Sequence, residues 1–129
     1  MQHYQSPATG NEISTVFHGV PAHILLDPDF IEKSLMDALA KDNFTILGSM
    51  PHRFVPSGYT ILVLLAESHA AIHTYPEHNA LYFSLYSCRG EEDGNGAFEY
   101  FKTQIPAESI EIINNKIIVN KDQALAAVH

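Results

Sequence analysis

Two apolar runs in the middle of the chain predict two strands that flank a polar stretch. Residues 61–66 read ILVLLA, too short to cross a membrane and long enough for a strand buried on both faces. Residues 81–88 read LYFSLYSC, an aromatic-rich run that also suits a strand. The stretch between them holds a serine, several histidines and two glutamates. Two rigid strands would hold such a reactive cluster in place, although polar residues at a strand end more often form an ordinary turn.

Helical spacing is found in two other segments. The first helix begins at Asp27-Pro28-Asp29, which supplies an N-cap, a proline at the first helical position and an acidic first turn. It runs for about three turns and ends near Lys41. The second helix follows a glycine-rich loop at residues 90–96, in which Asp93 or Asn95 is the expected cap. Its apolar face comprises Ala97, Phe98, Phe101 and Ile105.

The remaining segments favour short strands. We expect strands at residues 12–18, 44–48, 109–113 and 116–120, the last two joined by a turn at Asn114-Asn115. Residues 51–58 are rich in structure breakers and predict a connection, and residues 1–11 predict a flexible tail. Many adjacent strands and only two helices favour an α/β fold in which a mainly antiparallel sheet carries its helices on one face.

Composition narrows the function classes. The 129 residues suit a single domain, residues 1–129, and the net charge of −8 argues against nucleic acid as a partner. Eight histidines invite a metal interpretation, but the chain has no HExxH pattern and only one cysteine, so we expect no metal. The single cysteine also excludes an internal disulfide. No segment has the pattern of a membrane span or signal peptide, so no membrane association and a cytoplasmic location are expected.

Three short motifs carry a resemblance to a known family. They read ESH at residues 67–69, IHTYPE at residues 72–77 and CRG at residues 88–90. With these motifs at these spacings, the sequence resembles the prokaryotic S-adenosylmethionine decarboxylase proenzymes, which form their own pyruvoyl cofactor by self-cleavage. The likeness covers roughly residues 17–105 and includes the flanking segments LGS (47–49), HRF (52–54) and AFEY (97–100).

The resemblance implies a fold, an assembly and an activity. It implies a two-layer α/β sandwich, a homodimer of processed chain pairs, and cleavage between Glu67 and Ser68 that leaves a pyruvoyl group derived from Ser68. The implied substrate is S-adenosylmethionine, and the product would donate aminopropyl groups for spermidine and other polyamines. Decarboxylation of an α-amino acid leaves a carbanion that no ordinary side chain absorbs, whereas a ketone that forms an imine with the substrate amine does.

The family motif also implies a role for each reactive residue. His73 would remove the α-proton of residue 68 during processing, because histidine titrates near neutral pH. It stands five positions after Ser68, an odd separation that puts the two side chains on opposite faces of a straight strand, so we expect the backbone to bend near Ser68. Cys88 would return a proton to the substrate carbon, and Thr60 replaces a serine that assists processing. For Cys88 taken alone, a buried structural thiol is equally plausible.

The substrate is the point at which the sequence departs most from the family. Phe54 and Tyr75 match the two aromatic residues that sandwich adenine, and Glu77 matches the carboxylate at the ribose. Tyr75 replaces a tryptophan, and Val16 and His18 replace an aspartate and a tyrosine of the first-strand motif. Two alternatives therefore stand beside S-adenosylmethionine: a pyruvoyl-dependent arginine or ornithine decarboxylase, and a non-catalytic paralogue that binds a nucleoside or a partner subunit.

Overall fold

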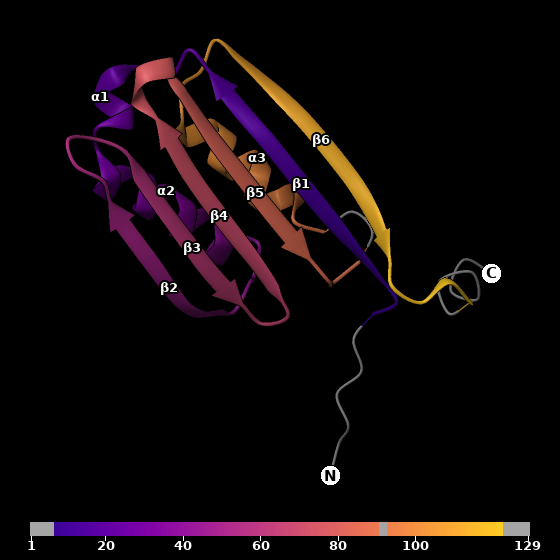
Figure 1. The fold of residues 1–129 in the computed structure, drawn as a ribbon. Helices are drawn as coiled ribbons and strands as arrows, with labels where there is room; N and C mark the ends of the chain where they lie inside the picture. The colour runs from indigo at the N-terminus through magenta and orange to yellow at the C-terminus, as the bar shows by residue number, and fades with distance from the viewer. Residues whose placement is uncertain (1–6, 91–92, 123–129) are drawn as a thin grey trace.

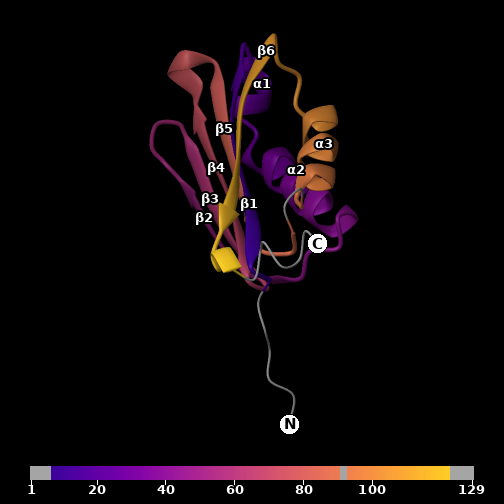
Figure 2. The ribbon, with the colours of Figure 1, turned by 90° about the vertical axis from the view of Figure 1, so that its right-hand side faces the viewer.

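A six-stranded antiparallel sheet with its helices packed on one face forms the body of the protein. The computed structural model describes residues 7–90 and 93–122. Figure 1 shows the sheet face-on, with the strand order β2-β3-β4-β5-β1-β6, and Figure 2 shows the helical layer on one side only. The predicted two-layer α/β architecture is confirmed.

The elements follow one another with short connections. The strands are β1 (Thr9–His18), β2 (Ile46–Arg53), β3 (Tyr59–Leu65), β4 (Ser68–Tyr75), β5 (Ala80–Ser87) and β6 (Ser109–Ile118). The helices are α1 (Ala22–Leu25), α2 (Pro28–Lys41), α3 (Asn95–Gln104) and the 3-10 helix η1 (Pro76–His78).

Helix α2 begins as its sequence predicts. The Asp27 carboxylate accepts a hydrogen bond from the Phe30 amide at 3.2 Å, and Pro28 occupies the first turn. The cap predicted for α3 is wrong, because Gly94 is the N-cap residue with φ 92° and no side-chain cap bond is made. A carboxylate from the end of α2 serves instead, since Asp42 Oδ2 accepts from the Ala97 amide at 2.9 Å.

The C-terminal strand is continuous, so the turn predicted at Asn114-Asn115 is wrong. β6 pairs with β1 without a break, from His18 opposite Ser109 to Thr9 opposite Ile118. The long partner strand overrides the local turn preference of the two asparagines.

The predicted tail is also shorter than expected. Residues 1–6 lie outside the described residues, but β1 begins at Thr9, and Gly10 and Asn11 are buried. The side-chain amide of Asn11 donates to the Asp93 carbonyl at 2.9 Å, a contact 82 residues away in sequence. Strand β2 begins two residues later than predicted and continues to Arg53, since an edge strand tolerates Pro51.

Strand β3 is buried on only one face in the chain, contrary to the prediction from its apolar run. Ile61, Val63 and Leu65 face the helices and are fully buried, whereas Leu62 and Leu64 are 48% and 59% exposed. The largest core side chains on the helical side include Phe17, Phe83 and Phe101. The opposite face, which we call the open face, carries no helix in the described part of the chain (Figure 2).

Candidate functional site

Ser68 lies directly after a tight turn between two central strands. β3 and β4 are joined by Ala66 and Glu67 alone, with Leu65 paired to Ser68. Glu67 adopts a left-handed conformation with φ 62°, which costs an L-residue roughly 1–2 kcal/mol. The Ser68 side chain is buried, and its Oγ accepts a hydrogen bond from the Cys88 amide at 3.2 Å. The strained residue and the fixed hydroxyl are thus adjacent at the predicted cleavage bond.

Cys88 follows the last residue of β5 and is half-buried. The pKa of Tyr86, two residues before Cys88, is raised above its usual value, first by its interaction with the Cys88 thiol and second by burial. The structure therefore brings Ser68 and Cys88 together at one end of the sheet, as the family motif implied.

A charged cluster that the sequence analysis missed anchors the segment around Cys88. The Arg89 guanidinium lies 3.6 Å from the centre of the Phe44 ring and pairs with Asp93 at 2.5 Å and with Asp42 at 3.4 Å. Ser87 Oγ also hydrogen-bonds Asp93. These contacts fix the end of β5 to the helical layer. Asp42 and Phe44 are far from Arg89 in sequence, so no local pattern predicted these two contacts.

Thr60 and His73 form a second pair at the other end of β3 and β4. The two residues are directly paired in the sheet, and Thr60 Oγ1 lies 2.9 Å from His73 Nδ1. Tyr82 lies beside the His73 ring at 5.9 Å between centroids. The hydroxyl and imidazole predicted to assist processing are therefore in contact.

The turn at Glu67 precedes Ser68 and does not bring His73 to it. β4 continues from Ser68 to Tyr75 with alternating faces, so Ser68 faces the helices and His73 the open face. Five residues of extended strand separate the two by about 16 Å. The bend expected near Ser68 thus exists, but it leaves these side chains apart within one chain.

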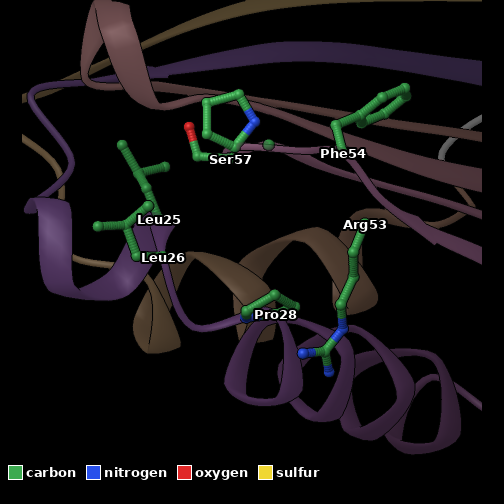
Figure 3. A pocket seen from close by; sticks show the side chains of 8 residues that line it. Leu25, Leu26, Pro28, Arg53, Phe54 and Ser57 are labelled. Carbon is green, nitrogen blue, oxygen red and sulfur yellow. The ribbon is translucent and has the colours of Figure 1, made fainter.

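The three predicted substrate residues lie at the same end as His73. Phe54 follows β2, is 51% exposed and has its ring 4.5 Å from that of His52. Tyr75 ends β4 with 43% exposure, and Glu77 lies exposed in η1. Beside Phe54, a pocket of about 190 Å³ opens between α1 and the loop after β2 (Figure 3). In Figure 3 Phe54 lies on one side of that loop, while Arg53 points toward α2, where it pairs with Asp29 at 2.6 Å.

The predicted site residues therefore form two separate groups, which lie at opposite ends of the sheet (Figure 1). The cleavage-end group comprises Glu67, Ser68 and Cys88. The binding-end group comprises Phe54, Thr60, His73, Tyr75 and Glu77. Among residues 7–90 and 93–122, no group of three or more metal-ligating side chains is found. Within the same residues, no helix is long and apolar enough to span a membrane.

This fold and this serine at the tip of a central hairpin define a two-layer α/β sandwich protein with a candidate self-cleavage bond. The family model described as S-adenosylmethionine decarboxylase matches residues 12–116. The chain belongs to the S-adenosylmethionine decarboxylase family.

Individual relatives agree with this assignment. An S-adenosylmethionine decarboxylase proenzyme of Geobacillus kaustophilus is 35% identical over 121 residues, which cover 90% of this chain and 97% of the relative. One from Thermosipho melanesiensis is 31% identical over 106 residues, 82% of either chain. The crystal structure of the adenosylmethionine decarboxylase from Aquifex aeolicus aligns with a TM-score of 0.81 at 28% identity, covering 91% of this chain and 97% of that one.

Proposed function

We propose that this chain is a self-processing decarboxylase of S-adenosylmethionine, whose product donates aminopropyl groups for polyamine synthesis. The observation that carries the proposal is the cleavage-end group, in which the left-handed Glu67 precedes a buried Ser68 whose hydroxyl is held by the Cys88 amide. Membership of the S-adenosylmethionine decarboxylase family indicates the reaction, and the geometry around Ser68 makes the Glu67–Ser68 peptide bond a suitable cleavage site. A cytoplasmic location remains a prediction.

Processing would use groups that the chain itself provides. The Ser68 hydroxyl adds to the Glu67 carbonyl and displaces the Ser68 nitrogen, which converts the peptide bond into an ester. Loss of the Ser68 α-proton then breaks the Cβ–O bond and frees the Glu67 carboxylate. Hydrolysis of the dehydroalanine that results releases ammonia and leaves a ketone at residue 68. The products are chains 1–67 and 68–129.

The surroundings of Ser68 fit a pyruvoyl group at that position. Residue 68 is 4% exposed, so the group would be shielded from bulk water, and the Cys88 amide is a ready donor for an oxygen there. The pyruvoyl group supplies the electron sink that decarboxylation requires. Cys88 would hold the proton to be delivered to the substrate carbon. Phe54 and Tyr75 would bind the adenine ring by stacking, and Glu77 would accept hydrogen bonds from the ribose.

We further propose that two copies of the chain share each site. One chain holds the Thr60–His73 pair about 16 Å along β4 from its own Ser68, so the proton acceptor that Ser68 needs is out of reach. A homodimer related by twofold symmetry, with the open faces together, can place the binding-end group of one copy against the cleavage-end group of the other. The exposed Leu62 and Leu64 on that face support such an interface.

Mass spectrometry of the purified protein tests self-cleavage. We expect two chains, with the fragment that begins at residue 68 lacking a free amino group. Ser68→Ala should stay whole and folded, since only a hydroxyl is removed. A single intact chain after long incubation would overturn the proposal.

Co-expression of two differently tagged variants tests the shared site. Ser68→Ala and His73→Ala should each remain uncut alone. In the mixed dimer, the His73→Ala chain keeps its own Ser68 and can use the partner copy's intact histidine, so that chain alone should be cut. If neither chain is cut in isolated mixed dimers, processing is confined to one chain and the shared site is wrong.

The substrate is tested by measuring carbon dioxide release from S-adenosylmethionine, arginine and ornithine side by side. Base–aromatic stacking contributes roughly 1–3 kcal/mol, and tyrosine keeps most of that surface, so S-adenosylmethionine should be preferred. Tyr75→Trp should raise its turnover. Turnover of arginine or ornithine without S-adenosylmethionine would favour the alternative substrate class.

A further inference from the structure

Arg89 directly follows the predicted proton donor Cys88, and no function has yet been given to it. Its Nε atom lies 2.5 Å from Asp93 Oδ2, the same carboxylate oxygen that accepts a hydrogen bond from the Ser87 hydroxyl. The backbone amide of Arg89 donates to Ser87 Oγ at 3.3 Å. The residues on either side of Cys88 are therefore bonded to each other and to one carboxylate, which restricts the backbone at Cys88 from both sides.

The rest of the guanidinium faces the helical layer. Nη2 lies 3.4 Å from Asp42 Oδ1, and Cζ lies 3.6 Å from the centre of the buried Phe44 ring. Asp42 is itself held, because its other carboxylate oxygen accepts from the Ala97 amide at 2.9 Å. A planar guanidinium can bond two carboxylates and stack on a ring at once, which an ammonium group cannot. We call the contacts of Arg89 with Asp42, Phe44 and Asp93 the clasp.

The clasp is better shielded from water than a surface ion pair. The side chains of Arg89, Asp42 and Asp93 are 34%, 22% and 19% exposed. Of the ion pairs found among the described residues, the two made by Arg89 are the least exposed. Fully exposed pairs contribute little because water screens them, whereas partly buried, hydrogen-bonded pairs hold their geometry. The clasp can therefore hold a backbone segment in place.

The clasp reaches the site through the backbone of Cys88. The Cys88 amide donates to Ser68 Oγ at 3.2 Å, so the position of this amide determines where the Ser68 hydroxyl is held. Cleavage before Ser68 would put Arg89 on one chain and both Asp42 and Phe44 on the other. The clasp would then join the two chains next to Cys88, close to the point where their covalent link is lost.

We infer that Arg89 is a positioning residue for Cys88: its guanidinium, bonded to Asp42 and Asp93, holds the Cys88 amide at Ser68 Oγ during processing and holds the thiol beside residue 68 afterwards. For its effect on processing and catalysis, this inference rests on the proposed function. Arg89 acts through Cys88, whereas substrate affinity depends on the binding-end group. Loss of the clasp should therefore slow self-cleavage and lower kcat while KM stays unchanged.

Amide exchange in uncut protein tests the clasp without requiring any activity. In the Ser68→Ala background the Arg89 amide keeps its acceptor, Ser87 Oγ, and NMR follows its exchange with solvent. Arg89→Met removes the charge and both ion pairs but keeps the backbone amide and an unbranched apolar stem. After correction for intrinsic rates, exchange at residue 89 should accelerate by about tenfold, the equivalent of one lost hydrogen bond. An unchanged exchange rate would overturn the clasp, whether or not the protein cleaves itself.

Lys102→Met is the matched control for the kinetic test. Lys102 also combines an ion pair, with Glu99 at 2.9 Å, and a ring contact, with Phe98 at 5.6 Å, but it lies in the last turn of α3. The control should cleave itself and turn over S-adenosylmethionine at the parent rates. Arg89→Met should cleave roughly tenfold more slowly and, once processed, show a lower kcat at unchanged KM. Arg89→Lys, whose ammonium serves one carboxylate at a time, should fall between Arg89→Met and the parent.

Parent rates of cleavage and turnover in folded Arg89→Met would contradict the positioning function, and so would a raised KM at unchanged kcat. If Arg89→Met does not fold, Arg89→Lys replaces it, and a parent cleavage rate and kcat in that variant would overturn the inference. If the parent itself stays whole, the proposed function fails, while the exchange measurement still decides whether Arg89 holds the segment at Cys88.

Discussion

Glu67 is the residue whose backbone conformation bears most directly on processing. Its left-handed φ of 62° lies immediately before Ser68, at the bond proposed to break. Local strain of this kind persists where the surrounding strands impose it, and the β3–β4 hairpin does so here. Opening the peptide bond would release that strain.

Glu67→Gly should therefore stabilise the uncut protein and slow its cleavage. Glycine adopts this conformation without steric cost, and after its larger entropy in the unfolded chain is subtracted we expect a gain of up to about 1 kcal/mol. Cleavage should slow by up to about fivefold, which is the rate equivalent of that energy. Glu67→Ala is the control, because it removes the same side chain and keeps the strain. Urea unfolding in the Ser68→Ala background gives the stability, and equal values for glycine and alanine would contradict the argument.

Tyr59 should make the free energy of unfolding depend on pH in the alkaline range. Burial, as the main cause, raises the pKa of this phenol from 10 to about 12. Between these values the unfolded chain ionises Tyr59 and the folded chain does not, so the free energy of unfolding falls as the pH rises through this window. Tyr59→Phe should show a shallower decline in urea titrations across the same range. A decline as steep as in the parent would assign the effect to other groups.

At the scale of single residues, the sequence predicted contacts between motif residues and missed those made with residues outside the motifs. Ser68 and Cys88 were expected to meet, and they do, through a backbone hydrogen bond. The Asp42 cap of α3 joins residues 55 positions apart, and no local pattern predicts such a pairing. The sequence also did not predict that His73 lies far from Ser68. A motif gives the spacing of residues along the chain, but it does not tell whether two of them would act within one chain or across two copies.

Among the elements, the long helix α2 was predicted correctly because its signals are local. Asp27 and Pro28 mark its start, and its apolar positions recur at helical spacing. The strands were harder, because pairing partners decide their limits. The sequence predicted a turn at Asn114-Asn115, but both residues pair with the ten-residue strand β1 and lie within β6.

The cap of α2 gives a test at the level of the element. Asp27→Ala removes the acceptor of the Phe30 amide and should lower the free energy of unfolding by about 1 kcal/mol. Asp27→Asn keeps an oxygen acceptor and should retain most of the stability. Urea denaturation of the three proteins in the uncut Ser68→Ala background measures the difference. An asparagine variant as unstable as the alanine variant would show that the charge, and not the cap, matters.

At the scale of the molecule, one face of the sheet is covered by helices and the other is open. Leu62 and Leu64 are apolar and about half exposed there, and with Met50 they border a shallow depression of about 310 Å³. This surface is where the proposed homodimer would form.

Leu64→Glu should dissociate that dimer. A charge at the centre of an apolar interface loses its hydration when the two copies associate, so association weakens strongly. Sedimentation velocity should show monomers, and self-cleavage should fall with the loss of the shared site. Leu26→Glu is the matched control, since Leu26 is 58% exposed against 59% for Leu64 but lies on the helical side. A dimer that survives Leu64→Glu would place the interface elsewhere.

The two-residue hairpin between β3 and β4 has a thermodynamic consequence once it is cut. After cleavage, β3 belongs to one polypeptide while β4 and β5 belong to the other, yet all three remain neighbours in one sheet. Neither fragment contains a whole sheet, so each would act as the folding template of the other. Folding of the processed enzyme then requires the association of two fragments, and this equilibrium depends on protein concentration. Its melting temperature should rise with protein concentration more steeply than that of uncut Ser68→Ala. Dilution would therefore destabilise the mature protein more than its precursor.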